Sequence, residues 1–204
     1  MNEKLDILKA EMNKIKTMLS TLGSANSSLA SGHHAKEFLS DELLKEVRLA
    51  APNARLSYVL RTSLERLEKS ERKEVVSVIC KEDACSALFT ACKKGNLEIV
   101  EYLVETCGAD IEQKGIYEVP DDRTNHIVSP LWCAAVSGRL EIVKYLVRKG
   151  ANVNVLSDTG STPVRSACFM THFDIVQFLV EHGNANILIP NNNSELWVHF
   201  FLNL

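Results

Sequence analysis

Apolar residues recur at helical spacing through most of this chain, in short blocks that end at glycine or at a polar turn. The clearest block is residues 128–154, VSPLWCAAVSGRLEIVKYLVRKGANVN. Its pattern predicts an inner helix over 131–137, ended by Gly138, and a second helix over 140–148. Proline suits the first turn of the inner helix because its missing N–H has no helical partner there. Neither helix can bury its apolar stripe alone, so the block needs neighbours of the same kind.

Two further copies of the block flank it, at residues 84–112 and 161–187. The small residue of the inner helix falls at Ala91, Ala134 and Ala167, so the copies are 43 and then 33 residues apart. Paired helices with a period of about 33 residues are typical of ankyrin repeats, and the first interval carries ten extra residues. The sequence therefore predicts an all-α fold, an ankyrin-repeat solenoid built from helix-turn-helix repeats.

The N-terminal segment, residues 1–22, is predicted to be an amphipathic helix. Its apolar residues follow the 3-4 spacing of a heptad seam: Leu5, Leu8, Met12, Ile15, Leu19 and Leu22. The seam is shorter than three heptads, so a weak homodimer through residues 5–22 and a helix docked on its own solenoid both stay open. Residues 23–39 begin with a run of Ser and Gly and are predicted to be a flexible linker.

The predicted ankyrin domain spans residues 40–190. Ser40 is the expected N-cap of its first helix, and residues 40–80 are predicted to form a degenerate capping repeat. Thr171 stands where the other copies have glycine between their helices, a replacement that costs about 1 kcal/mol. Residues 191–204 begin like a further repeat, which indicates either a truncated repeat or a tail that packs on the last one.

Composition and charge exclude several functions. The net charge of −3 leaves no basic surface for a nucleic acid, and no apolar run approaches the roughly 20 residues of a membrane span. Neither a nucleophile–base pair nor paired catalytic carboxylates nor a phosphate-binding glycine loop is found. We therefore predict no enzymatic activity and no cofactor.

The cysteines lack the Cys-x-x-Cys spacing of a zinc site. There are six: Cys80, Cys85, Cys92, Cys107, Cys133 and Cys168. Three of them lie beside the small alanine of an inner helix, which favours buried, unligated thiols. We predict no metal site and a reducing compartment, the cytoplasm, with the nucleus as the second location.

The ten extra residues belong to an insertion, residues 113–127, that carries turn chemistry at Pro120-Asp121-Asp122. Insertions in a solenoid form loops along one edge, often the binding edge. Tyr117 together with Asp121 and Asp122 suits a basic or amide-bearing peptide. The alternative is a solvated loop whose acids contact nothing.

Several of these motifs resemble one family. SPLWCAA, the long loop before it, and STPVRSACF followed by DIVQFLVEHGNANI are similar to the Fem (feminization) homologue ankyrin family. Trp132 and Arg165 replace the histidine of the usual ankyrin inner helix, as in that family. KEVVSVI, residues 73–79, is also similar, and the resemblance covers roughly residues 45–190.

The resemblance implies a substrate receptor of a cullin-RING ubiquitin ligase, whose concave face holds the C-terminus of a target, often one ending in or near arginine. The family's acidic loop falls at Asp121 or Asp122, its turn serine at Ser161, and its Cys-Phe pair at Cys168-Phe169. Met170 replaces the acid that follows this pair in the family, which weakens an arginine ligand by about 10- to 100-fold. Family members continue into further repeats and a segment that engages elongin and cullin.

The leading hypothesis is a protein-interaction module that recognises C-terminal degrons in protein ubiquitination. Its predicted peptide-binding residues are Tyr117, Asp121, Asp122, Trp132, Ser161, Arg165, Phe169 and Met170. The alternative is a non-degradative scaffold or a dominant-negative regulator, with a cullin–elongin ligase joining only a longer form. A decayed gene product is the third interpretation.

Overall fold

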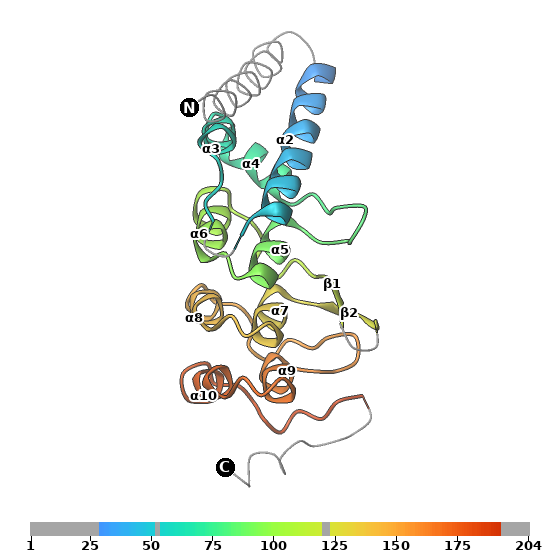
Figure 1. Cartoon of the computed structure of the whole chain (residues 1–204), viewed down its shortest axis with the longest axis vertical. Helices are drawn as coiled ribbons and strands as arrows, with labels where there is room; N and C mark the ends of the chain where they lie inside the picture. Colours follow the sequence, from blue (N-terminus) through green and yellow to red (C-terminus); the bar gives the residue numbers. More distant parts are fainter. Residues whose placement is uncertain (1–28, 52–53, 120–122, 193–204) are drawn as a thin grey trace, which may run out of the picture.

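The protein is described by a computed structural model that covers residues 29–51, 54–119 and 123–192. Its helices are α2 (Leu29–Leu49), α3 (Tyr58–Glu65), α4 (Lys69–Val76), α5 (Ala87–Lys94), α6 (Leu97–Glu101), α7 (Pro130–Val136), α8 (Leu140–Arg148), α9 (Pro163–Phe169) and α10 (Phe173–Glu181). Figure 1 shows the outer helices α6, α8 and α10 stacked in one layer, beside the inner helices α5, α7 and α9. The predicted ankyrin-repeat solenoid is confirmed.

Each inner helix begins at a side-chain cap. Ser86, Ser129 and Thr162 accept a hydrogen bond from the backbone N–H three residues on, at 3.2, 3.2 and 3.3 Å. These caps satisfy donors that the first helical turn leaves open. Local sequence thus sets where each repeat starts. The helix predicted over 140–148 matches α8 at both ends, and the one predicted over 131–137 differs from α7 by one residue at each end.

The inner helices stack closely because their central residues are small. Ala91, Ala134 and Ala167 are completely buried, and α7 packs between α5 and α9. The outer helices contribute an Ile-Val pair per repeat to the same core. This repeated contact explains how helices of seven to nine residues, which are too short to be stable alone, hold their form here.

The outer helix of the first repeat contains one residue more than its counterparts. Gly108 comes eleven residues after Leu97, whereas Gly150 comes ten after Leu140. The structure absorbs the extra residue in a π-helical turn, η2 (Tyr102–Thr106), which continues α6. A single inserted residue is the usual origin of such a turn, and both ends of the repeat keep their register.

Helix α2 begins at Leu29, so the linker predicted over residues 23–39 is wrong from residue 29 onward. Ala35, Leu39, Leu43 and Val47 are buried at intervals of four, which is one face of a single helix. Packing of this face against α3, α4 and α5 outweighs the run of small polar residues at its start.

The predicted N-cap role of Ser40 is also wrong. Ser40 lies in the middle of α2, is buried, and its hydroxyl donates to the carbonyl of Lys36 at 2.9 Å. A serine can therefore satisfy its hydroxyl inside a helix as well as at its start. The predicted helix at 1–22, with its dimerisation through residues 5–22, and the tail from residue 193 lie outside the described residues.

The insertion expected as a loop contains an antiparallel hairpin, β1 (Gly115–Glu118) paired with β2 (Asn125–Val128). Gly115 lies opposite Val128, and Glu118 lies opposite Asn125. Figure 1 shows the hairpin projecting from the side of the inner helices that lies away from the outer layer. The predicted turn falls at the tip of this hairpin, where residues 120–122 are outside the described part.

Thr171 occupies the position of Gly95 and Gly138 and has the same left-handed backbone, with φ of 59°. A β-branched residue is strained there. We expect Thr171→Gly to raise the free energy of unfolding by about 1 kcal/mol, measured by urea denaturation. Thr171→Ala keeps a Cβ and serves as the control. An equal gain in both variants would show that the backbone at this position is not strained.

Candidate functional site

Two adjoining hollows lie along the inner side of the array, beside α2 and α5. The first has a volume of 830 Å³ and the second 590 Å³. Arg48, Lys81 and Glu82 line both of them, so the hollows adjoin at these residues. We call the pair the inner groove. A groove of this size accepts a short extended segment of another chain.

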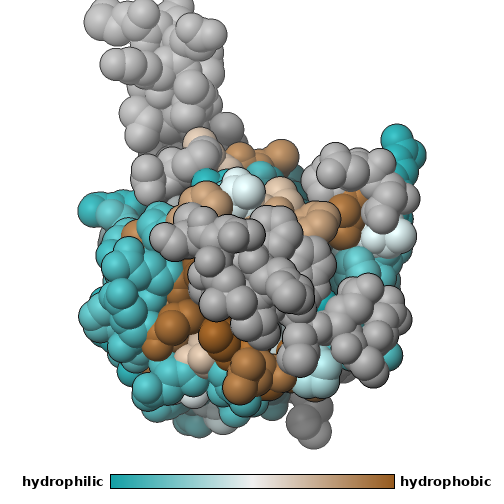
Figure 2. Space-filling view, turned by 90° about the horizontal axis from the view of Figure 1, so that it is seen from below, coloured by the Kyte–Doolittle hydropathy of each residue, from teal (hydrophilic) through white to brown (hydrophobic). Residues whose placement is uncertain are grey.

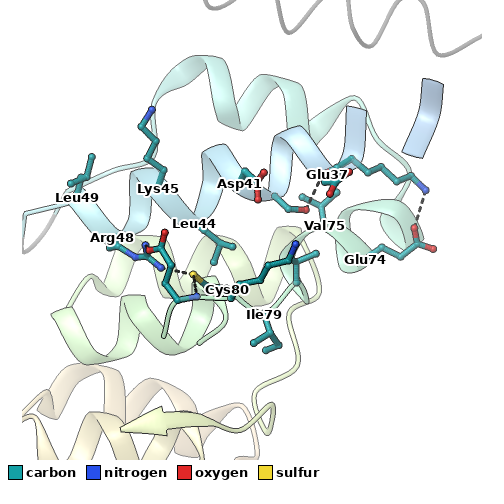
Figure 3. Close-up of a pocket in the computed structure, with 15 residues that line it drawn as sticks. Glu37, Asp41, Leu44, Lys45, Arg48, Leu49, Glu74, Val75, Ile79 and Cys80 are labelled. Carbon is teal, nitrogen blue, oxygen red and sulfur yellow. Dashed lines mark hydrogen bonds and ion pairs between the residues drawn. The ribbon is translucent and has the colours of Figure 1, made fainter. Parts of the chain in front are cut away.

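The first hollow has an apolar wall. Figure 3 shows α2 on one side and the segment with Ile79 and Cys80 on the other. Leu44 and Val75 are buried at its base, while Val78 and Ile79 are each 39% exposed. Exposed aliphatic side chains beside a buried apolar base form a surface that another apolar side chain can cover.

Arg48 stands where the two hollows meet. Its guanidinium contacts the thiol of Cys80 and the carboxylates of Glu82 and Asp83, the last at 3.2 Å. Figure 3 marks the contact with Cys80. This thiol and the neighbouring acids raise the pKa of the Arg48 guanidinium, which stays charged. The single cation thus contacts two carboxylates, which leaves the cluster with a net charge of −1.

The segment that carries these acids folds back on itself. Cys80 N–H donates to the Cys85 carbonyl at 3.0 Å, and Ala84 N–H donates to the Cys80 carbonyl at 3.0 Å. Ala84 takes a left-handed backbone, with φ of 51°, to close the turn. The turn holds the acids of the Arg48 cluster at the boundary between the hollows.

The second hollow is bounded by α5 and the hairpin. Gly115 allows β1 to lie directly on Phe89, because a Cβ at Gly115 would be 2.9 Å from the ring. Lys93 and Lys94 end α5 on the other side, and the Lys93 ammonium lies 4.9 Å from the centroid of the Tyr117 ring. This cation–π contact holds Lys93 in place.

Tyr117 and Trp132, two of the predicted ligand contacts, form a small second core beneath the hairpin. Their rings meet edge to face, with centroids 5.6 Å apart, and each residue is only 6% exposed. Phe89, Val128 and Val136 complete the cluster. The structure thus gives both aromatics a packing role, and their contact with a ligand stays a prediction.

The indole N–H of Trp132 is buried without an acceptor among the residues that the structure describes. His126 lies beside it, with ring centroids 6.4 Å apart, and the Nδ1 of His126 is 3.5 Å from the Asp158 carboxylate. A buried donor without a partner costs about 1–3 kcal/mol. The hydrophobic contacts of the indole ring must offset this cost.

The remaining predicted residues lie further along the array. Ser161 precedes the helix cap Thr162, and its N–H donates to the Ser157 hydroxyl at 2.9 Å. Arg165 is half-buried on α9, whereas Phe169 is 66% exposed and Met170 is 40% exposed. The structure does not bring these four into the inner groove. Asp121 and Asp122 lie outside the described residues.

Phe169 and Met170, at the end of α9, are exposed side chains of the α9–α10 repeat. Phe173, at the start of α10, is 48% exposed. Figure 2 looks at the α10 end and shows hydrophobic atoms at the surface beside hydrophilic ones.

The groove residues that sequence reasoning missed are Arg48, Val78, Ile79, Lys81, Lys93 and Lys94. The sequence contains a local signal for four of these residues. Val78 and Ile79 are adjacent apolar residues past the end of a helix, and Lys93-Lys94 is the only lysine pair at the end of an inner helix. Neither signal shows by itself that the residues share one hollow.

The six cysteines are all unpaired, and only Cys80 is not buried. Burial raises the pKa of Cys85 and of Cys107 to about 11, and it also raises the pKa of Cys92 and Cys133 well above the ordinary value. A thiol with a pKa of 11 carries about 100-fold less thiolate at neutral pH than one with the ordinary value of 9.0. The predicted role of the inner-helix cysteines as buried thiols agrees with this.

We expect Cys80 to be the one thiol of the folded chain that a disulfide reagent modifies quickly. Cys80 faces the inner groove, and the other cysteines are buried. The measurement is the number of thiols released in the fast phase with Ellman's reagent at neutral pH. Cys80→Ser should remove that phase, and urea should expose the rest. A fast phase that survives in Cys80→Ser would contradict the burial of the others.

Within the described ranges, no group of His, Cys, Asp or Glu side chains is arranged to hold a metal ion. The same ranges contain no helix with the length and apolar character of a membrane span.

Comparison with known proteins agrees with this architecture. A family model described as ankyrin repeats in three copies matches residues 120–191, and a single-repeat ankyrin model matches residues 83–113. Together the two matches cover the three repeats found in the sequence.

Three curated proteins similar to this chain are all named as fem-1 homologs. Over 90 residues the chain is 48% identical to the Drosophila melanogaster protein fem-1 homolog CG6966, covering 44% of this chain and 13% of that protein. Over 106 residues it is 37% identical to fem-1 homolog A of Rattus norvegicus and 42% identical to fem-1 homolog A-A of Mus musculus, covering 52% of this chain and 16% of each relative. The chain thus matches only a small part of the length of these relatives.

Proposed function

We propose that this chain, an ankyrin-repeat protein similar to the Fem-1 homologues, binds an extended segment of a partner protein in its inner groove. Ankyrin repeats are protein-interaction modules, and the chain carries three of them. The observation that carries the proposal is that the two hollows adjoin at Arg48, Lys81 and Glu82. Two adjoining hollows can hold side chains from several consecutive residues of one ligand.

The partner segment in this proposal is the C-terminus of a target protein, presented for ubiquitination. The family resemblance supports this role, and so does the hairpin that borders the second hollow. Tyr117 anchors that hairpin, and Asp121 and Asp122 lie between its two strands in the sequence. Recruitment of a cullin–elongin ligase is part of the same proposal. A scaffold that binds the same segment without a ligase is the alternative.

Two measurements test the proposal. The chain is screened against a library of peptides with free C-termini, and the selected peptides are measured again with Asp121→Ala, Asp122→Ala and Phe169→Ala. Absence of any selected peptide refutes the binding function. Selection that all three variants leave unchanged removes these residues from the site.

Affinity purification from cells separates the two versions of the function. Elongin and cullin subunits that co-purify with the chain support the receptor. Partner proteins without those subunits favour the scaffold. Light scattering of the full chain, and of a variant with Leu8→Asp and Ile15→Asp, tests the proposed dimerisation through residues 5–22. A monomer in both cases removes the dimer.

A further inference from the structure

Unpaired positive charge gathers in the second hollow. Lys81, Lys93 and Lys94 line it, and within the part of the chain that the structure describes none of them forms an ion pair. Glu82 and Asp83 also line it, but both already contact Arg48. Glu118 is the one remaining acid among the lining residues. Among all the lining side chains, Arg48 and the three lysines face three carboxylates, so the hollow carries one net positive charge.

The end of helix α5 does not account for these lysines. Basic residues often stabilise the last carbonyls of a helix. Here the carbonyls of Ala91 and Cys92 already accept backbone N–H groups from Gly95, at 3.0 and 3.3 Å, and Asn96 donates to Ala91 as well, at 3.0 Å. The Lys93 ammonium lies against the Tyr117 ring, and both it and the Lys94 ammonium can still donate hydrogen bonds to another acceptor.

The first hollow has a different character. Val78 and Ile79 expose aliphatic surface over the buried Leu44 and Val75. Two of its three lysines are already engaged, since Lys36 pairs with Glu71 and Glu74, and Lys45 pairs with Glu42; the third, Lys81, also lines the second hollow. The inner groove thus joins an apolar compartment to a basic one.

We propose that the inner groove selects an extended peptide in which an apolar side chain fills the first hollow and an Asp or Glu side chain meets Lys93 and Lys94 in the second. This inference rests on the proposed function and names the chemistry of its ligand. The opposite charges of peptide and groove set the register of the segment, and the apolar residue supplies buried area. An arginine-rich segment would place its cations against these lysines.

The test is a display of random linear peptides, each with a free C-terminus, against the full chain. Peptides selected by the unaltered chain are expected to be enriched in Asp and Glu next to apolar residues. Lys94→Glu should weaken their binding by about 10-fold, and so should replacing the peptide acid by its amide. Ile79→Ser should weaken binding with no change in the charge preference. Added salt should reduce the effect of Lys94→Glu.

Lys69→Glu is the matched control. Lys69 begins α4 and lies beside Gly108, at the end of the outer layer, and it does not line the inner groove. Circular dichroism verifies that each variant is folded.

The outcomes separate the preference for acidic peptides from peptide binding itself. Peptides that bind without acidic residues, or that respond equally to Lys94→Glu and Lys69→Glu, overturn the inference and leave peptide binding intact. Binding that C-terminal amidation abolishes, and that loss of the acidic side chain does not affect, also overturns it, because the carboxylate is then the chain end. A library that yields no binder at all removes the proposed function itself.

Discussion

Replacing Trp132 by alanine is expected to lower the free energy of unfolding by about 3–5 kcal/mol, the range for removal of a buried aromatic ring. Trp132 is 6% exposed and packs edge to face on Tyr117, which belongs to strand β1. Removing the indole leaves a cavity between the inner helices and the hairpin. The measurement is urea denaturation followed by circular dichroism.

Trp132→Phe is the control that separates packing from hydrogen bonding. Phenylalanine keeps an aromatic ring against Tyr117 and removes the indole N–H that has no acceptor among the described residues. Relief of that donor offsets part of the lost contact, so Trp132→Phe is expected to lie within about 1 kcal/mol of the unaltered chain. A loss as large as that of Trp132→Ala would show that the N–H is satisfied and contributes to stability.

The second large effect is expected at Gly138, between helices α7 and α8. Gly138→Ala should cost about 2–4 kcal/mol, of which about 1 kcal/mol comes from the left-handed backbone, with φ of 69°. The rest comes from a steric clash, because the new Cβ would be 2.8 Å from Cε1 of His172. The ring cannot move freely, since its Nε2 is 3.3 Å from the carbonyl oxygen of Val136.

Gly150→Ala isolates the backbone contribution. Gly150 has φ of 88°, and a Cβ there would meet no atom within 4 Å. It should therefore cost only about 1 kcal/mol. Equal losses at the two glycines in urea denaturation would show that His172 yields without penalty. A larger loss at Gly138 would confirm that the next repeat packs directly on the glycine turn.

Much of the repeat architecture could be predicted because its signals are local. The caps Ser129 and Thr162, the proline after each of them, and the glycine turns lie within a few residues of the structure they determine. Helix α2 was placed too late for a related reason. The run of Ser and Gly before residue 33 led to the prediction of a linker, although apolar residues recur every four positions from Ala35 and form the buried face of the helix.

The candidate site was predicted less well, because a groove depends on segments that are distant in the chain. Arg48 and Lys94 come from different repeats, and the segment around Cys80 lies between them. Trp132 was predicted as a ligand contact because it is an aromatic on an inner helix, yet the hairpin packs against it. The sequence around Trp132 does not indicate that strand β1 packs on it. Gly115 allows this packing because it lets β1 lie directly on Phe89.

By itself, the sequence determined the stacked repeats. The period, the turn glycines and the amphipathic outer helices leave one economical way to bury their apolar faces, since each repeat can be covered only by another. Only the tertiary structure decided which surfaces stay open. The packing of turns from successive repeats decides that Val78 and Ile79 are exposed, that Trp132 is buried and that the lysines of α5 form no ion pair. The residues next to these positions in the sequence do not determine that packing.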